Sequence, residues 1–148
     1  MLTAKGKYGL KALVHLARLP PGQLALVADV AQANSIPKKF LDAILGDLRN
    51  AGIVQSRKGK GGGYRLAHLP EEIKVGAIVR VLDGPLAPIP CASHTRYQAC
   101  DDCDVETCQV RRMMLNVRNA IAEVLDHTTL AQMRDAEGEV LPIELRTA

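Results

Sequence analysis

The chain has 148 residues, a length that fits one compact domain, with or without a helical extension, and excludes two independent enzymatic domains. Its 47% hydrophobic and 24% charged residues exclude a disordered chain, and its three tyrosines, one phenylalanine and no tryptophan argue against an RNA-binding sheet that stacks bases on aromatic rings. The formal net charge of +3 combines +8 in residues 1–69 with −5 in residues 70–148; this predicts a basic half that faces a polyanion, although an unevenly charged, solvated surface would give the same split.

Two helices are predicted in the first 34 residues. Thr3 can cap the first helix, which ends at the turn Pro20-Pro21-Gly22. Its apolar residues recur at helical spacing, and they are Leu10, Leu13, Val14 and Ala17. A second, shorter apolar stripe consists of Leu24, Val27, Ala28 and Ala31. A polar break at Asn34-Ser35 then predicts a tight turn.

A third helix is predicted to begin near Pro37, because proline is tolerated in a first helical turn, and to end at Gly52. Its apolar stripe consists of Leu41, Ile44, Leu45 and Leu48. The opposite face carries Lys38, Lys39, Asp42 and Arg49. Two short helices joined by a tight turn, the second with basic residues at its start, are typical of a helix-turn-helix that places a helix in the DNA major groove, although a generic three-helix bundle would show the same stripes.

A basic, glycine-rich hairpin follows the third helix. Residues 53–57 and 64–66 read as two strands, and the segment between them is Lys58-Gly59-Lys60-Gly61-Gly62-Gly63. Glycines let the backbone approach a phosphate closely, and Arg57, Lys58 and Lys60 supply positive charge. The segment matches no nucleotide-binding glycine motif and leads into a strand, so we interpret it as the wing of a winged helix-turn-helix. An uncommitted flexible hairpin is the alternative.

A fourth helix and a long fifth helix are predicted in the second half. The fourth has apolar residues at Val75, Ile78, Val79 and Leu82 and ends at Asp83-Gly84. Apolar residues of the long helix alternate four and three apart, at Val110, Met114, Val117, Ile121, Val124 and Thr128. Because the chain has no second long helix, we expect a homodimer through residues 110–131, with packing onto the chain's own domain as the alternative. Residues 132–148 are expected to be a flexible tail.

All four cysteines lie in one predicted loop, with the spacing C-x8-C-x2-C-x4-C. No apolar run spans a bilayer and residues 1–7 lack a secretory signal, so we expect a cytoplasmic protein with no membrane partner. In that reducing compartment the cysteines are expected to be metal ligands or redox thiols, with zinc, copper(I) and iron-sulfur clusters as the metal candidates. Free thiols or a reversible disulfide are alternatives to a metal. The proposed metal ligands are Cys91, Cys100, Cys103 and Cys108.

Three segments give the sequence a family resemblance. The opening residues 1–13, with Lys5-Gly6-Lys7-Tyr8-Gly9-Leu10, the helix of residues 36–49 and the wing of residues 61–66 resemble the IscR/NsrR-type (Rrf-two) family of bacterial winged-helix transcriptional regulators. The Asp83-Gly84-Pro85 turn is followed by a cysteine loop and then a long helix, and this order of segments also resembles that family. The resemblance implies a homodimer that binds palindromic promoter sites on double-stranded DNA through the recognition helix and wing. It also implies an iron-sulfur cluster, of the 2Fe-2S or 4Fe-4S type, held by loop cysteines.

Family roles transfer to this chain position by position. The resemblance assigns the start of the recognition helix to Lys38, Lys39 and Phe40, and the groove-facing wing residue to Lys58 or Arg57. Cys91 and Cys108 match the first and last cluster cysteines, whereas either Cys100 or Cys103 matches the middle one. Arg111 stands where IscR-like members have a histidine ligand, so an all-thiolate site would need the fourth cysteine. The candidate DNA-contacting residues are Lys38, Lys39, Phe40, Arg49, Arg57, Lys58, Lys60, Gly61, Gly62 and Tyr64.

The predicted architecture is mainly α with a small β-hairpin: a winged helix-turn-helix plus a long C-terminal dimerisation helix. Its parts are a DNA-binding region in residues 1–69, a linking helix and cysteine-rich sensor loop in 70–109, the dimerisation helix in 110–131 and the tail in 132–148. No nucleophile with a base and an orienting group is recognisable, so we predict a regulator rather than an enzyme. The predicted function is DNA binding controlled by an iron-sulfur cluster. The alternatives are a zinc or thiol switch without a cluster, and a metal-carrying protein-interaction module.

Overall fold

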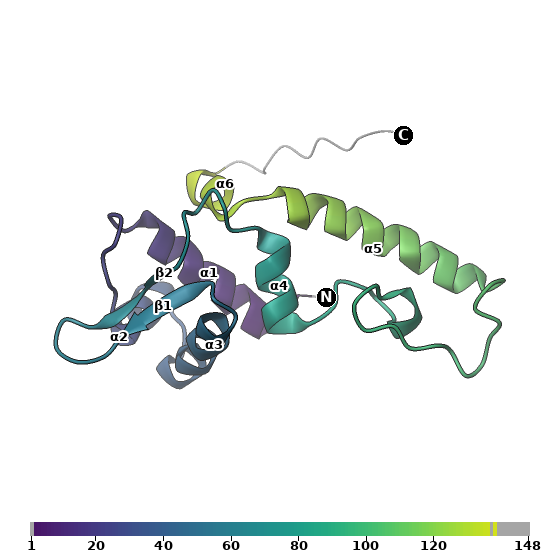
Figure 1. The fold of residues 1–148 in the computed structure, drawn as a ribbon, viewed down its shortest axis with the longest axis horizontal. Helices are drawn as coiled ribbons and strands as arrows, with labels where there is room; N and C mark the ends of the chain where they lie inside the picture. The colour runs from purple at the N-terminus through teal and green to yellow at the C-terminus, as the bar shows by residue number, and fades with distance from the viewer. Residues whose placement is uncertain (1, 137, 139–148) are drawn as a thin grey trace.

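The computed structural model describes residues 2–136 and 138. It is mainly helical, with one two-stranded antiparallel hairpin, as predicted. Figure 1 shows a body built from α1–α4, the hairpin and α6, from which α5 and the cysteine loop extend. The elements are α1 (Ala4–Arg18), α2 (Val27–Asn34), α3 (Lys38–Asn50), β1 (Val54–Arg57), β2 (Gly63–Leu66), α4 (Val75–Asp83), the short 3-10 helix η1 (Pro90–Ala92), α5 (Gln109–His127) and α6 (Leu130–Asp135). No helix among the described residues is both long and apolar enough to cross a membrane.

The apolar core joins α1, α3 and α4. The stripes predicted for α3 and α4 are buried, and Leu13 of α1 is fully buried with them. Two glycines let α4 approach α1 closely: a Cβ atom on Gly9 would lie 2.1 Å from a methyl carbon of Leu82, and one on Gly6 would lie 2.3 Å from the Asp83 carboxylate. Asp83 also accepts hydrogen bonds from the backbone N–H and the hydroxyl of Thr3, the N-cap of α1. The start of α1 is therefore fixed against the end of α4.

The turn between α2 and α3 has the geometry of a helix-turn-helix. Ser35 ends α2 in the left-handed conformation at φ 54°, the only non-glycine residue with positive φ in the part of the chain that the structure describes. Pro37 is the N-cap of α3 rather than a residue of its first turn, and the Leu41 N–H donates to its carbonyl at 3.0 Å. The helix therefore begins one residue after the proline that was expected to open it.

The hairpin is anchored to the body by a third short segment. β1 and β2 pair in the register Val54↔Leu66 to Arg57↔Gly63, and Ala25 forms an isolated bridge with Tyr64 on the other side. Gly63 has φ 143°, and a Cβ atom there would lie 2.3 Å from the Ala25 carbonyl oxygen, so this crossing needs glycine. Strand β2 is thus held on both edges, by β1 and by Ala25, while the wing loop projects outward (Figure 1).

An ion pair joins α4 to α5. The Arg80 guanidinium donates to both oxygens of Asp126, at 2.6 and 2.9 Å, and this hydrogen bonding lowers the pKa of the Asp126 carboxyl. Gly76 leaves room for this ion pair, because a Cβ atom at that position would lie 1.9 Å from Asp126 Oδ1. The long helix is therefore linked to the helix that packs against α1.

The long helix ends earlier than the predicted limit of residue 131. α5 ends at His127, and Thr129 then opens α6 with a capping box, in which its hydroxyl accepts from the Gln132 N–H and the Gln132 side chain accepts from the Thr129 N–H. Residues 132–135 of the predicted tail are therefore helical. Residues 137 and 139–148 of that tail lie outside the described residues.

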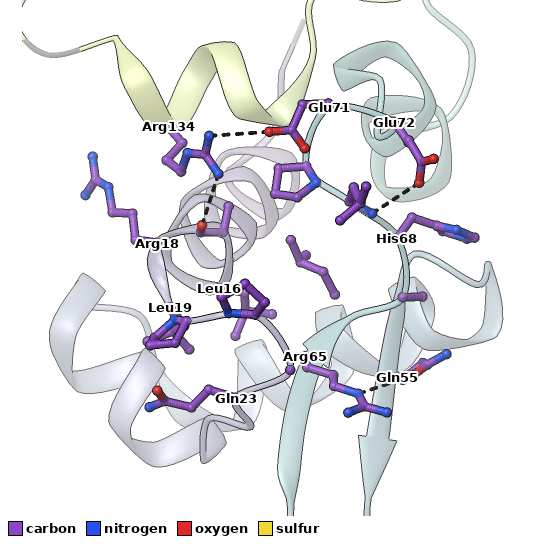
Figure 2. A pocket seen from close by; sticks show the side chains of 18 of the residues that line it. Leu16, Arg18, Leu19, Gln23, Gln55, Arg65, His68, Glu71, Glu72 and Arg134 are labelled. Carbon is purple, nitrogen blue, oxygen red and sulfur yellow. Dashed lines mark hydrogen bonds and ion pairs between the residues drawn. The ribbon is translucent and has the colours of Figure 1, made fainter.

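α6 returns to the body and packs on α1. Leu130 is fully buried in the core that α1, α3 and α4 share. Arg134 reaches the Ala17 carbonyl at 3.5 Å and the Glu71 carboxylate at 3.6 Å, along the edge of a cavity of about 1030 Å³ (Figure 2). Helix α6, which follows α5, thus completes the hydrophobic core that α1, α3 and α4 form.

Leu130→Ala is expected to lower the free energy of unfolding by about 2–5 kcal/mol, because it leaves a cavity where a fully buried side chain stood. Urea denaturation followed by circular dichroism measures this. Leu69→Ala is the matched control, since Leu69 is 61% exposed and its truncation is expected to cost less than about 0.5 kcal/mol. Equal stabilities of the two variants would contradict the position of α6.

Candidate DNA-binding surface and metal centre

The N-terminus of α3 is an exposed, basic helix end. Lys38, Lys39 and Phe40 form its first turn and are all exposed, and no side chain caps the backbone N–H groups there. Lys38 pairs with Asp42 one turn later, at 3.1 Å. Free N–H groups and lysines at a helix start suit a phosphate or a base edge. The structure thus brings together three of the predicted DNA-contacting residues.

Phe40 is held in place by an aromatic contact that the sequence did not indicate. Its ring meets Tyr8 of α1 edge to face, with centroids 5.6 Å apart, while Phe40 remains 39% exposed. An exposed aromatic side chain beside a groove-binding helix start can contact a thymine methyl group. Tyr8 is therefore a supporting residue of this surface, visible only once α1 and α3 are placed side by side.

The wing presents its basic residues to solvent. Arg57, Lys58 and Lys60 are exposed, and the loop turns through two glycines with positive φ, Gly59 and Gly61. Figure 1 places the wing loop and α3 along the edge of the body that lies away from α5 and α6. A double-stranded polyanion that lies along that edge could therefore contact both the wing loop and α3.

Three of the predicted DNA-contacting residues lie apart from the exposed residues of the α3 start and the wing loop. Gly62 is buried, and a Cβ atom there would lie 2.2 Å from the Arg57 carbonyl oxygen, so its role is to shape the loop. Tyr64 is half-buried at the base of the wing and packs against the core. Arg49 is exposed in the last turn of α3, about 16 Å along the helix axis from Lys38.

The four cysteines approach one another between η1 and α5. Cys91 lies in η1 and is buried, and its Sγ lies 3.7 Å from that of Cys100. The sulfur atoms of Cys100 and Cys103 lie within 4.8 Å of each other and of a carboxylate oxygen of Asp102. Cys108 is the N-cap of α5, and its sulfur accepts from the Arg111 N–H at 3.4 Å and contacts Cys103. The four thiols, spread over 18 positions, thus form a series of neighbouring pairs, Cys91–Cys100, Cys100–Cys103 and Cys103–Cys108, which is called the thiol cluster below.

The environments of the thiols differ. Burial raises the pKa of Cys91, and the contact with Cys103 raises the pKa of Cys100, whereas the Arg111 N–H lowers the pKa of Cys108. The negative charge of Asp102 disfavours thiolates at Cys100 and Cys108. A cationic centre would offset this clustered charge, and four soft sulfur donors suit an iron-sulfur cluster or zinc. The residues present therefore fit the cofactor that was expected from the sequence.

The outer side of α5 is apolar and uncovered. Ala122 is its only buried residue within the described part of the chain. Four large apolar side chains on this helix are at least 36% exposed, and they are Val110, Met113, Val117 and Ile121. Three of them belong to the predicted dimer seam, whereas Met114 and Val124 are half-buried.

Comparison with known proteins covers nearly the whole chain. Residues 2–136 match the model of the family Rrf2, described as "Iron-dependent Transcriptional regulator". An Rrf2-like HTH-type transcriptional regulator of Rhodobacter capsulatus is 42% identical over 137 residues, which are 90% of this chain and 91% of the relative. The transcriptional regulator CymR of Bacillus subtilis is 35% identical over 141 residues, covering 93% of this chain and 94% of CymR.

Solved structures of regulators share the fold. The structure of CymR, titled the global cysteine regulator of B. subtilis, superposes with a TM-score of 0.74 at 33% identity, covering 90% of this chain and 95% of CymR. The structure of IscR of T. potens superposes with a TM-score of 0.72 at 33% identity, covering 93% of this chain and 88% of IscR. These relatives are regulators and not enzymes, which confirms the predicted winged helix-turn-helix architecture and the predicted class of function. The chain belongs to the Rrf2 family of transcriptional regulators.

Proposed function

We propose that this regulator is a homodimer that binds palindromic promoter DNA with an affinity controlled by an iron-sulfur cluster on Cys91, Cys100, Cys103 and Cys108. The observation that carries the proposal is the series of close approaches between thiols of η1, the loop and the N-cap of α5, at the start of the apolar helix. The family description as iron-dependent and the likeness to an IscR structure support the same cofactor.

The chain offers a direct route from the thiol cluster to the DNA-binding surface. When bound, the cluster would supply iron-sulfur bonds that oxidants or nitric oxide can break. Arg111 links Cys91 of η1 to the first turn of α5, Arg80 and Asp126 join α5 to α4, and Gly9 lets α4 lie directly on α1. Release of the loop would change how α5 is held, and with it the spacing of two recognition helices, which must match half-sites about 34 Å apart.

Anaerobic purification tests the cofactor. We expect a coloured protein with iron and sulfide in the sample, and a DNA affinity that changes when the same sample is exposed to oxygen. A colourless protein that contains zinc and no iron would overturn the cluster and identify a zinc-bound regulator.

A thiol switch is a second candidate, favoured by the 3.7 Å between the sulfur atoms of Cys91 and Cys100. A hydroperoxide would oxidise the two thiols: its O–O bond would break, its oxygens would take up two electrons and the two thiol protons to leave as an alcohol and water, and an S–S bond would form. Mass spectrometry of the metal-free protein after peroxide treatment detects this bond. If no disulfide is found, and all four thiols can be alkylated after the protein is unfolded without a reductant, the thiol switch is refuted.

Lys38→Ala, Lys39→Ala and Lys58→Ala are each expected to weaken DNA binding at all sequences, because each removes a cation facing the phosphates. The slope of log affinity against log salt is expected to fall by about 0.9 per lost phosphate contact. Fluorescence anisotropy with a palindromic operator over a salt series measures the slope. Lys74→Ala is the control, since Lys74 is exposed at the start of α4 and outside α3 and the wing. If the slope is unchanged in all three variants, the assignment of DNA binding to this surface is refuted.

A further inference from the structure

Arg111 contacts both ends of the cysteine loop. Its backbone N–H donates to the sulfur of Cys108 at 3.4 Å, and its side-chain Nε donates to the carbonyl oxygen of Cys91 at 2.9 Å. Twenty residues separate Arg111 from Cys91, yet one side chain joins η1 to the first turn of α5. No other hydrogen bond between described side chains and backbone links these two elements.

Arg111 cannot serve as a metal ligand. A guanidinium has five N–H donors, stays protonated and has no lone pair to offer a metal. It occupies the position at which the family resemblance would place a histidine ligand, three residues after Cys108. The chain therefore replaces a donor atom with a cation, and Cys100 together with Cys103 supplies the sulfur atoms that would complete the set.

The half-buried Arg111 side chain acts on the loop through the backbone of Cys91. Between the two anchored cysteines, the sulfur atoms of Cys100 and Cys103 and a carboxylate oxygen of Asp102 lie within 4.8 Å of one another. Metal binding requires the thiols to lose protons, which adds negative charge to this group. A hydrogen bond from Arg111 to the Cys91 carbonyl holds Cys91 and Cys108 at a set spacing against that repulsion.

We propose that Arg111 is a positioning residue that clamps Cys91 to Cys108, so that the loop presents its thiols to a metal at a fixed spacing. The inference rests on the proposed metal-binding function. Outer contacts that orient metal ligands typically change affinity by about 10–100-fold when they are removed. Arg111 is expected to act in this way without touching the metal.

The test uses Co²⁺ as the probe, added to the full-length, reduced, metal-free protein in the absence of oxygen. Tetrahedral Co²⁺ bound by thiolates absorbs in the visible and near-ultraviolet, which reports both affinity and sulfur ligation. Arg111→Ala is expected to lower Co²⁺ affinity about tenfold while the final spectrum stays that of an all-sulfur site. Arg118→Ala is the matched control: it removes the same charge from the same helix, and its hydrogen bond goes to Asn119. Its affinity is expected to stay within about twofold of the wild type.

Arg111→Lys separates position from charge. It keeps the cation but loses the Nε–H that meets the Cys91 carbonyl, so its affinity is expected to fall between those of the alanine variant and the wild type. Full wild-type affinity in Arg111→Lys would show that charge alone suffices and would overturn the clamp, as would unchanged affinity in Arg111→Ala. A wild type that binds Co²⁺ tightly but assembles no iron-sulfur cluster would refute the proposed function and leave the role of Arg111 standing.

Discussion

Val117→Glu is expected to abolish the proposed dimer and leave a monomer. Val117 lies in the middle of the exposed apolar row on α5, between Met113 and Ile121. In a two-fold interface the same surface is used by both protomers, so one substitution places two carboxylates in an apolar seam. Sedimentation velocity at micromolar concentration measures the change.

The same variant is expected to bind palindromic DNA about 10²–10⁴-fold more weakly, because the second half-site is no longer reached at high effective concentration. Asn119→Glu is the control: it adds the same charge to an exposed position two residues further along α5, which points to another side of the helix. A dimeric Val117→Glu protein, or a monomeric Asn119→Glu protein, would contradict the seam on α5.

Cys108→Ser is expected to reduce the iron and sulfide content of anaerobically purified protein to background. Cys108 caps α5, contacts Cys103 and is the thiol whose pKa the Arg111 N–H lowers. The variant removes this sulfur donor, while the serine hydroxyl can still cap the helix, so the effect reports on the metal ligand. DNA affinity of this variant is then expected to equal that of cluster-free wild type, with or without oxygen. Visible absorption, metal analysis and DNA anisotropy on one sample measure these effects.

Thr107→Ala is the control for this experiment, because Thr107 is exposed and immediately precedes Cys108. It is expected to retain iron, sulfide and the response to oxygen. Serine variants of Cys100 and Cys103 extend the test: loss of iron in both would support a four-thiolate site, and loss in only one would identify the middle ligand. A Cys108→Ser protein that keeps a full complement of iron would refute the role of this loop as the metal site.

Much of the fold could be predicted because its signals are periodic and local. The apolar stripes of α3 and α4 are buried as expected, and in the α1 stripe all residues but the half-buried Val14 are buried. The glycine-rich segment between β1 and β2 is a hairpin loop. α6 was not predicted, because it has only six residues and its sequence signal is the pair Thr129 and Gln132. Pairing of Ala25 with Tyr64 was not predictable either, since a single bridge leaves no alternating pattern.

The candidate site was predicted in composition but not in geometry. Spacing showed that four thiols share a loop, and the structure brings Cys91 and Cys100, nine positions apart, to 3.7 Å. The contact of Arg111 with the Cys91 carbonyl depends on how η1 packs against α5, which no local pattern records. Tyr8 supports Phe40 for the same reason: the two rings are 32 positions apart in the chain and meet only after folding.

The return of α6 to α1 has a consequence for anyone who would cut this protein into pieces. A fragment that stops at the end of α4 would contain every basic residue of the predicted DNA-binding surface, yet it would lack Leu130, which is fully buried against the core of that fragment. It would also lack Arg134, which reaches the Ala17 carbonyl. The predicted DNA-binding region therefore depends on a segment that is distant in sequence, and a shortened version would have to join the end of α4, near residue 84, to residues 128–135 by a linker in place of the loop and α5.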